Sequence, residues 1–336
     1  MKKLAIHDFL KLAESTPVLD VRSPAEYEQG RLPNSHNMPL LDNDERAVVG
    51  TLYKQTGPKV AFKKGLEFIG PKMSGFIEFA ESLKSENLLV HCWRGGQRSQ
   101  SVATLLETYG FKVNTLDGGY KSYRHAAIQF FTKPLPLIVL TGFTGSRKTE
   151  VLHELARLGE QVIDLEGLAN HQGSAFGRRP SEIQPSVEQF QNMLFEEFRK
   201  MNLSKRIWLE DESMRIGGVN MTQELYHQKN AAPCVFMEIP RASRIKNLVT
   251  NYGKQDEANL IRAANSIQKK LGLREAEQAI EFIRQGEAKD AAGIILKYYD
   301  KRYAKSIDDK KDHISIHLQL DERDPAILAK AILNKL

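Results

Sequence analysis

The residues best suited to chemistry lie in two short glycine-rich segments. In the first, Cys92 follows the apolar run 88–90 and precedes Gly95 and Gly96 at the predicted start of a helix. Successive backbone N–H groups of such a turn, and the positive end of the helix, favour a thiolate and a bound anion. We therefore expect Cys92 to be a nucleophile. A buried, inert thiol is the alternative, but it leaves the neighbouring arginines and glycines unexplained.

The groups around this thiol predict an anion-binding loop. Five residues separate Cys92 from Arg98, which leaves room for a wide ring of N–H donors around a tetrahedral oxyanion, and an arginine can bind such an anion with two nitrogens. Trp93 is expected either to pack within the loop or to form a lid or stacking surface for a base. The predicted anion-binding residues are Arg94, Gly95, Gly96, Arg98 and Ser99.

The second glycine-rich segment links the apolar run 137–141 to a helix that begins with a Lys-Thr pair. Strand, glycine-rich loop, Lys-Thr and helix together are the signature of a phosphate-binding P-loop. Lys148 would contact phosphate oxygens, and Thr149 could hold magnesium. Arg147 stands where the signature expects glycine, and its side chain would either crowd the phosphates or add an anion contact. The predicted phosphate-binding residues are Gly142, Thr144, Gly145, Ser146, Lys148 and Thr149.

Acidic residues follow a later apolar strand. The run 207–209 leads into Glu210, Asp211 and Glu212, and in P-loop proteins acids at such a place can position metal or water. Exposed turn acids are the alternative. The two cysteines, Cys92 and Cys234, have neither metal-ligand spacing nor a disulfide framework. Zinc is therefore not indicated, and no residue is assigned as a metal ligand, although magnesium could bind at the P-loop.

The elements that would position these residues alternate between strand and helix, which predicts an α/β fold with parallel sheets. Residues 18–21 form a short predicted strand, and Ser23, Pro24 and Glu26 then give the start of a capped helix. A chain of 336 residues is long for a single core. Because the prolines in 133–136 break any helix, we expect a first domain over 1–132 and a second over 133–336.

Composition favours an ordinary globular protein, with 27% charged and 41% hydrophobic residues. The net charge of +6 gives mild support for a polyanionic partner. The N-terminus lacks the apolar core of a signal peptide, and the longest apolar run, 135–140, is too short to cross a bilayer. We therefore expect a cytoplasmic protein with no membrane partner.

The first domain resembles the rhodanese-like family. The residues that carry the resemblance are 19–27, 30–35, the Cys92 loop and 116–120, in the family's order. In such domains the loop cysteine carries sulfur or a related atom, so the resemblance implies that Cys92 is a chalcogen carrier. The Cys-x5-Arg spacing is longer than that of usual sulfurtransferases and is similar to that of cysteine-dependent phosphatases, which makes a phosphate-like donor plausible.

The whole chain, with its P-loop NTPase-like second domain, resembles the bacterial tRNA 2-selenouridine synthases. Besides the two loops, the resemblance rests on residues 171–177, 184–186, 210–213 and 216–217. It implies replacement of sulfur by selenium in wobble-position 2-thiouridine of tRNAs of the Lys, Glu and Gln type. The implied donor is selenophosphate, and geranyl diphosphate first attaches a geranyl group to the sulfur. No tightly bound cofactor is implied, and a selenophosphate-supplying enzyme is an expected partner.

Our own interpretation assigns selenophosphate to the Cys92 loop and the prenyl diphosphate to the P-loop. Two other functions stay open: a Cys-x5-Arg phosphatase or sulfurtransferase fused to a P-loop kinase-like domain, and a tRNA-binding or regulatory module with degenerate loops. Basic residues beside aromatic ones predict tRNA contacts, although a solvated helix face is the alternative for each. The candidates are Arg178, Arg179, Arg241, Arg244, Lys246, Lys297, Lys301, Arg302 and Lys305, beside Tyr298, Tyr299 and Tyr303.

Overall fold

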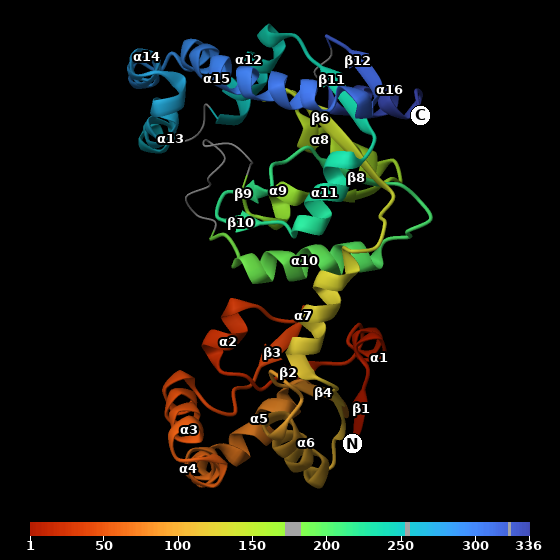
Figure 1. Cartoon of the computed structure of the whole chain (residues 1–336), viewed down its shortest axis with the longest axis vertical. Helices are drawn as coiled ribbons and strands as arrows, with labels where there is room; N and C mark the ends of the chain where they lie inside the picture. The colour runs from red at the N-terminus through yellow and green to blue at the C-terminus, as the bar shows by residue number, and fades with distance from the viewer. Residues whose placement is uncertain (172–182, 253–255, 322–323) are drawn as a thin grey trace. The chain divides into compact units, whose positions relative to one another are not determined.

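The computed structural model describes residues 1–171, 183–252, 256–321 and 324–336. The chain divides into two compact units, Met1–Phe130 and Phe131–Leu336. Each unit is built on its own five-stranded parallel sheet (Figure 1). The predicted α/β class with parallel sheets is therefore confirmed.

Unit 1 has the strand order β1-β5-β4-β2-β3, with all neighbours parallel. Its strands are β1 (Lys2–Leu4), β2 (Val18–Asp20), β3 (Ser35–Asn37), β4 (Asn87–His91) and β5 (Lys112–Leu116). Its helices are α1 (Ile6–Leu12), α2 (Pro24–Gln29), α3 (Asn43–Gln55), α4 (Pro58–Ile69), the short 3-10 helix η1 (Gly70–Lys72), α5 (Met73–Ser82), α6 (Gln97–Tyr109) and α7 (Gly119–Phe130).

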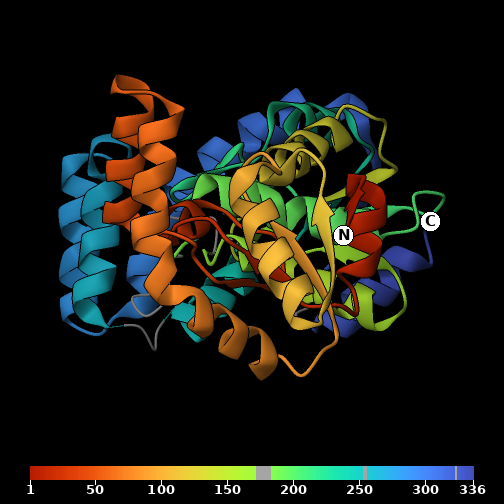
Figure 2. The ribbon, with the colours of Figure 1, turned by 90° about the horizontal axis from the view of Figure 1, so that it is seen from below.

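Both faces of this sheet are covered. Helices α5 and α6 bury Phe76, Val102 and Leu106 against Leu88 and Val90 of β4. On the other face, α1 and α7 contact β5 and each other, while α3 and α4 lie side by side at the edge of the unit (Figure 2). The predicted capping box at the start of α2 is present. The helix predicted after the cysteine loop is α6, and it ends at Gly110 as expected.

Unit 2 has the strand order β12-β11-β6-β8-β7, again all parallel. Its main strands are β6 (Leu137–Gly142), β7 (Gln161–Ile163), β8 (Ile207–Glu210), β11 (Cys234–Glu238) and β12 (Ile314–Gln319), and β9 (Arg215–Ile216) pairs with β10 (Val219–Asn220). Its helices are α8 (Lys148–Arg157), α9 (Leu165–Leu168), α10 (Val187–Lys200), α11 (Gln223–Ala231), α12 (Arg241–Tyr252), α13 (Glu257–Leu271), α14 (Leu273–Arg284), α15 (Ala288–Asp309), the short η2 (Lys311–His313) and α16 (Pro325–Leu333).

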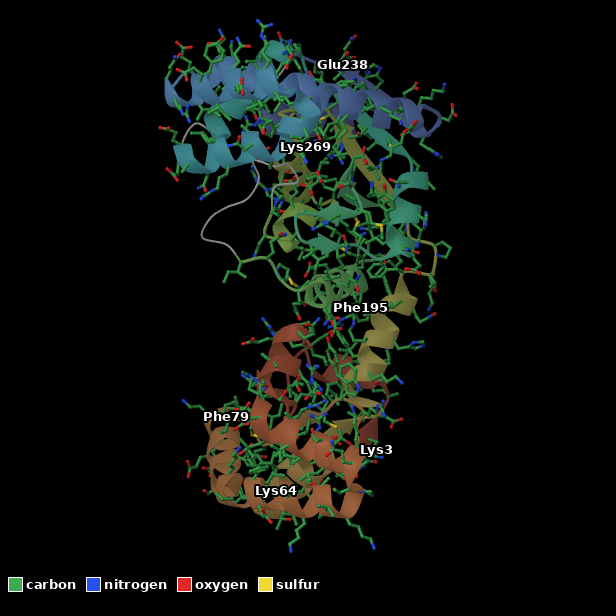
Figure 3. All side chains as sticks on the ribbon, turned by 60° about the vertical axis from the view of Figure 1, so that its left-hand side comes forward. Lys3, Lys64, Phe79, Phe195, Glu238 and Lys269 are labelled. Carbon is green, nitrogen blue, oxygen red and sulfur yellow. The ribbon has the colours of Figure 1, made fainter. Side chains whose placement is uncertain are left out.

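Two apolar clusters of the described residues help to stabilise unit 2. Leu152 and Leu155 of α8 pack with Leu328 of α16 against the sheet, whereas α13, α14 and α15 enclose a separate apolar cluster that includes Ile280 and Ile295. Figure 3 shows the side chains that lie between the helices and the sheet of unit 2. Strand β6 lies at the centre of the sheet, so the loop that follows it opens at the carboxyl edge, where open α/β sheets bind ligands.

Within the described residues, no helix is both long and apolar enough to span a bilayer. The location of the protein in the cell stays a prediction.

Candidate functional sites

The Cys92 thiol lies just beyond β4, in the loop that leads into α6. Its side chain is buried, and its Sγ is 3.2 Å from Ser99 Oγ. Because the Ser99 hydroxyl also donates to the Gly96 carbonyl oxygen at 3.1 Å, the hydroxyl oxygen can accept a hydrogen bond from the thiol. The same hydroxyl could turn towards a thiolate once the proton leaves. Ser99 is thus the direct partner of the predicted nucleophile.

Gly119, at the start of α7, lies directly against the backbone of the cysteine loop. Tyr120 N donates to Cys92 O at 2.8 Å, and Lys121 N donates to Trp93 O at 2.9 Å. Gly119 has φ near +60°, and a Cβ there would lie 2.4 Å from Cys92 O. Only glycine allows such a close approach. The sequence motif at 116–120 therefore has a physical role: it lets the start of α7 support the cysteine loop.

Arg98, the predicted oxyanion contact, is engaged by a carboxylate. Its two terminal nitrogens donate to Glu26 at 2.7 and 3.3 Å. Burial raises the pKa of Glu26, but its hydrogen bond and ion pair with Arg98 outweigh burial and hold that pKa below its usual value. An anion would therefore have to replace Glu26 to bind both nitrogens of Arg98. Arg94, by contrast, is exposed.

A buried polar cluster, which the sequence analysis missed, lies beneath this loop. The fully buried Arg22 pairs with Asp20 and stacks over the Tyr120 ring at 3.7 Å. His91, whose pKa is lowered by burial, lies next to the same ring. The sequence signal for this cluster was the pair of charged residues at the end of β2, Asp20 and Arg22. Trp93 is half-buried with its ring centroid 5.6 Å from that of Tyr120, so it packs against the start of α7, and its role as a stacking surface for a base stays a prediction.

The P-loop runs from the end of β6 at Gly142 to the start of α8 at Lys148. Lys148 Nζ donates to Gly142 O at 3.1 Å and lies 5.4 Å from the centroid of the Tyr303 ring. A Cβ at Gly142 would lie 2.8 Å from Ser146 Oγ. That hydroxyl is buried and has no hydrogen-bond partner among the described residues. The loop is therefore compact, and its lysine is held across the turn.

Arg147 adopts a backbone shape that normally belongs to glycine. It is the N-cap of α8 with φ 63° and ψ 35°, in the left-handed region. Its Nε lies 3.2 Å from Glu150 Oε1. The departure from the P-loop signature thus changes the side chain while the backbone keeps the positive φ that glycine adopts without strain.

Helix α12 fixes the far side of the P-loop. Arg244 Nη1 donates to Thr144 O at 3.0 Å, and Asn247 Nδ2 donates to Gly145 O at 2.9 Å. Arg244 also pairs with Asp300 of α15 at 2.7 Å and is only 4% exposed. The prediction that Arg244 contacts tRNA is therefore wrong, because a buried, paired arginine cannot meet a backbone phosphate.

Carboxylates crowd the P-loop from β8 and α9. Thr149 Oγ1 donates to Glu166 Oε2 at 3.2 Å, and Glu166 N donates to Glu210 Oε2 at 3.2 Å. Burial, then the charge of Glu212, raises the pKa of Glu166 to about 8, and burial followed by the charge of Glu166 raises that of Glu210. Glu210 and Glu212 are buried, which excludes exposed turn acids. The sequence analysis missed Glu166, which lies three residues beyond the end of β7.

Asp211 is different from its neighbours because it is paired with cations. It accepts from Thr141 Oγ1 at 2.8 Å and Lys229 Nζ at 3.0 Å, and it also pairs with Lys310. Burial raises its pKa, but the two lysines outweigh burial and lower the pKa to about 2. The described residues contain no group of three or more His, Cys, Asp or Glu side chains that could hold a metal. Magnesium at Thr149 stays a prediction.

Described residues from three further segments of the family resemblance, 171–177, 184–186 and 216–217, lie close together near β9 and β10. Gln184 Nε2 donates to Ala169 O at 2.8 Å, and Gly218 N donates to Gln184 Oε1 at 2.7 Å. A Cβ at Gly217 would lie 2.6 Å from His171 Cδ2. Segments far apart in the sequence therefore form one packed group.

The predicted tRNA contacts have different surroundings. Residues 172–177, Arg178 and Arg179 lie outside the described residues. Tyr299 is buried and Tyr298 and Tyr303 are half-buried. The exposed basic candidates are Arg241, Lys246, Lys297, Lys301, Arg302 and Lys305.

A cysteine loop on one parallel sheet and a P-loop on another define a rhodanese-like unit joined to a P-loop unit. Family models agree: that of the rhodanese-like domain matches residues 5–126, and that of the tRNA 2-selenouridine synthase AAA domain matches residues 135–324. The chain belongs to the tRNA 2-selenouridine synthase family.

Three similar proteins are named tRNA 2-selenouridine synthase. A tRNA 2-selenouridine synthase of Nitrosomonas europaea is 36% identical, over 70% of this chain and 63% of its own length. Those of Shewanella pealeana and Shewanella halifaxensis are 31% and 32% identical, over 93% and 89% of this chain and 96% and 90% of theirs. Among solved structures, the N-terminal domain of a Clostridium difficile 630 protein described as binding ATP or GTP is 39% identical, with a TM-score of 0.35, over 37% of this chain and 97% of that chain.

Proposed function

We propose that this protein is an enzyme that replaces the sulfur of wobble-position 2-thiouridine in tRNA by selenium. The observation that carries the proposal is the presence, in one chain of this family, of a buried thiol in an anion-type loop and a P-loop lysine beside carboxylates. The relatives named above are called tRNA 2-selenouridine synthases.

The first step is alkylation of the sulfur at the P-loop. Sulfur bound to C2 of a pyrimidine leaves poorly as sulfide, and an attached geranyl group makes it a better leaving group. The sulfur attacks C1 of geranyl diphosphate, the C–O bond breaks, and diphosphate leaves. Lys148 and the loop N–H groups would stabilise the departing negative charge.

This alkylation releases a proton from N3 of the base, which needs an acceptor. Glu166 is suited to that role because its pKa of about 8 lies close to neutral pH, where a carboxyl can both take up and return a proton. It lies beside Thr149, one residue beyond Lys148. We therefore assign Glu166 as the base of the geranyl-transfer step.

The second step is selenation through the Cys92 loop. In this scheme the Cys92 thiolate attacks phosphorus of selenophosphate, the P–Se bond breaks, and hydroselenide is released while water later hydrolyses the phosphocysteine. Hydroselenide then attacks C2 of the alkylated base and expels geranylthiolate. Ser99 would stabilise the thiolate at 3.2 Å, and Arg98 would bind the phosphoryl oxygens after exchanging Glu26.

A second candidate function rests on the same thiol. The hydroxyl beside Cys92 and the Cys-x5-Arg spacing also suit a phosphatase or a plain sulfurtransferase. Turnover of a phosphate ester, or of thiosulfate with cyanide, in the absence of tRNA would identify that function.

Nucleoside mass spectrometry tests the main proposal. Incubation of 2-thiouridine tRNA with the protein, selenophosphate and geranyl diphosphate should yield 2-selenouridine. Omission of selenophosphate should leave S-geranyl-2-thiouridine, and omission of geranyl diphosphate should leave the thiouridine unchanged. An unchanged nucleoside in the complete mixture, together with tRNA-free turnover, would replace the main proposal by the second.

A further inference from the structure

A cavity of about 580 Å³ opens in unit 2 beside the acids that follow β8. Its size lies within the range of small-ligand sites, about 300–1,000 Å³. Three tyrosines line it, Tyr226 from α11 and Tyr299 and Tyr303 from α15, together with Glu212, Lys229 and Arg302. Aromatic and charged side chains thus line the same cavity.

The cavity is connected to the P-loop through shared residues. Tyr303 lines the cavity, and Lys148 Nζ lies 5.4 Å from the centroid of its ring. Glu212 also lines the cavity and lies close enough to Glu166 to raise its pKa. A ligand held here would therefore lie next to the proposed diphosphate site.

The lining fits a pyrimidine better than a prenyl chain. A base offers two flat faces for stacking on tyrosine, as in many RNA-binding proteins, and its edge offers an N–H donor beside carbonyl-type acceptors. Glu212 can accept from such a donor, and Lys229 can donate. Tyr226 is half-buried, and Lys229 Nζ lies 5.3 Å from the centroid of its ring. A hydrocarbon chain would instead bring apolar atoms against these charged groups and displace the water around them, which is costly.

We propose that this cavity binds the flipped-out pyrimidine base of the RNA substrate, which stacks on Tyr226 and turns its hydrogen-bonding edge to Glu212 and the neighbouring Glu166. The inference rests on the proposed function, because it assumes that RNA is the substrate. It assigns to the P-loop unit the recognition of the base, in addition to the donor. Enzymes that modify a base must take it out of the stack to reach its atoms, and a cavity next to Lys148 provides the place.

Fluorescence anisotropy with two labelled stem-loop RNAs tests the proposal. One carries 2-thiouridine at the wobble position, and the other has an abasic site there. The unaltered protein should bind the first about tenfold more tightly or better, since stacking of one base contributes that much. Tyr226→Ala should bind both RNAs equally weakly, Tyr226→Phe should keep the preference, and Tyr53→Ala, at a tyrosine of unit 1 that is 61% exposed, should behave as the unaltered protein.

A crosslink provides a second measurement that needs no variant. The same stem-loop with photoreactive 4-thiouridine at the wobble position should crosslink to a peptide from α11, from α15 or from the segment 211–217, all of which line the cavity. Crosslinks confined to other segments, or a Tyr226→Ala protein that still prefers the base, would overturn the cavity assignment while selenouridine formation by the unaltered protein leaves the function standing. If the unaltered protein neither binds the stem-loop nor modifies tRNA, both the function and this inference fall.

Discussion

The Glu166→Gln substitution tests whether the P-loop carboxylates carry an electrostatic cost. A folded-state pKa of about 8 instead of 4.5 corresponds to about 5 kcal/mol against the ionised form. In the unfolded chain the carboxyl ionises near 4.5, so folding is opposed as pH rises from about 4.5 to 8, and the cost is full above 8. Glutamine is never ionised, so it removes this cost while it keeps a side-chain oxygen that can accept from Thr149.

We expect Glu166→Gln to stabilise the protein by about 1–3 kcal/mol at pH 8 and by much less at pH 5, since Glu210 and Glu212 remain and keep part of the repulsion. Thermal or urea unfolding at the two pH values measures the difference, and the exposed Glu277→Gln on α14 is the control. The same variant should lose geranyl transfer, because the proposed base is gone. Equal stability changes at both pH values, or destabilisation at pH 8, would refute the reasoning.

Three further substitutions separate the two loops. Cys92→Ser should reduce selenation to background while geranyl transfer continues, as nucleoside mass spectrometry would detect; selenouridine at the normal rate would remove Cys92 as nucleophile. Lys148→Ala should slow geranyl transfer about a hundredfold or more yet spare selenation of tRNA supplied already geranylated, and equal loss of both steps would point to a shared site. Arg147→Gly keeps the left-handed backbone, so stability should change by less than about 1 kcal/mol, the relief of strain offsetting the lost contact with Glu150. Geranyl diphosphate binding should weaken with a flatter salt dependence by titration calorimetry, whereas tighter binding would mean that the side chain obstructs the site.

Local patterns predicted the fold well because the decisive features are local. The apolar runs, the capping box before α2 and the glycine at the end of α6 act within a few residues, and the structure contains each of them. The two glycine-rich loops follow central strands of the parallel sheets for the same reason.

Contacts between distant segments could not be inferred in this way. Nothing in the sequence near Arg98 indicates that Glu26, 72 residues away, holds it. Arg244 has the composition of a surface contact, yet its hydrogen bonds to Thr144 and Asp300 bury it. Glu166 acquires its raised pKa only because folding brings Glu212 and a low-dielectric wall next to it. The sequence shows which side chains are charged, whereas the burial and the partners of each charged side chain depend on the tertiary structure.

The buried Arg244 makes the conformation of the P-loop depend on helices outside the loop. One guanidinium group ties a loop carbonyl at Thr144 to the strand end at Ile239 and to the long helix α15 at Asp300. The conformation of the loop is therefore a property of α12 and α15 as much as of its own eight residues, 142–149. Grafting that segment onto another parallel sheet would transfer its motif without the helices that hold its shape.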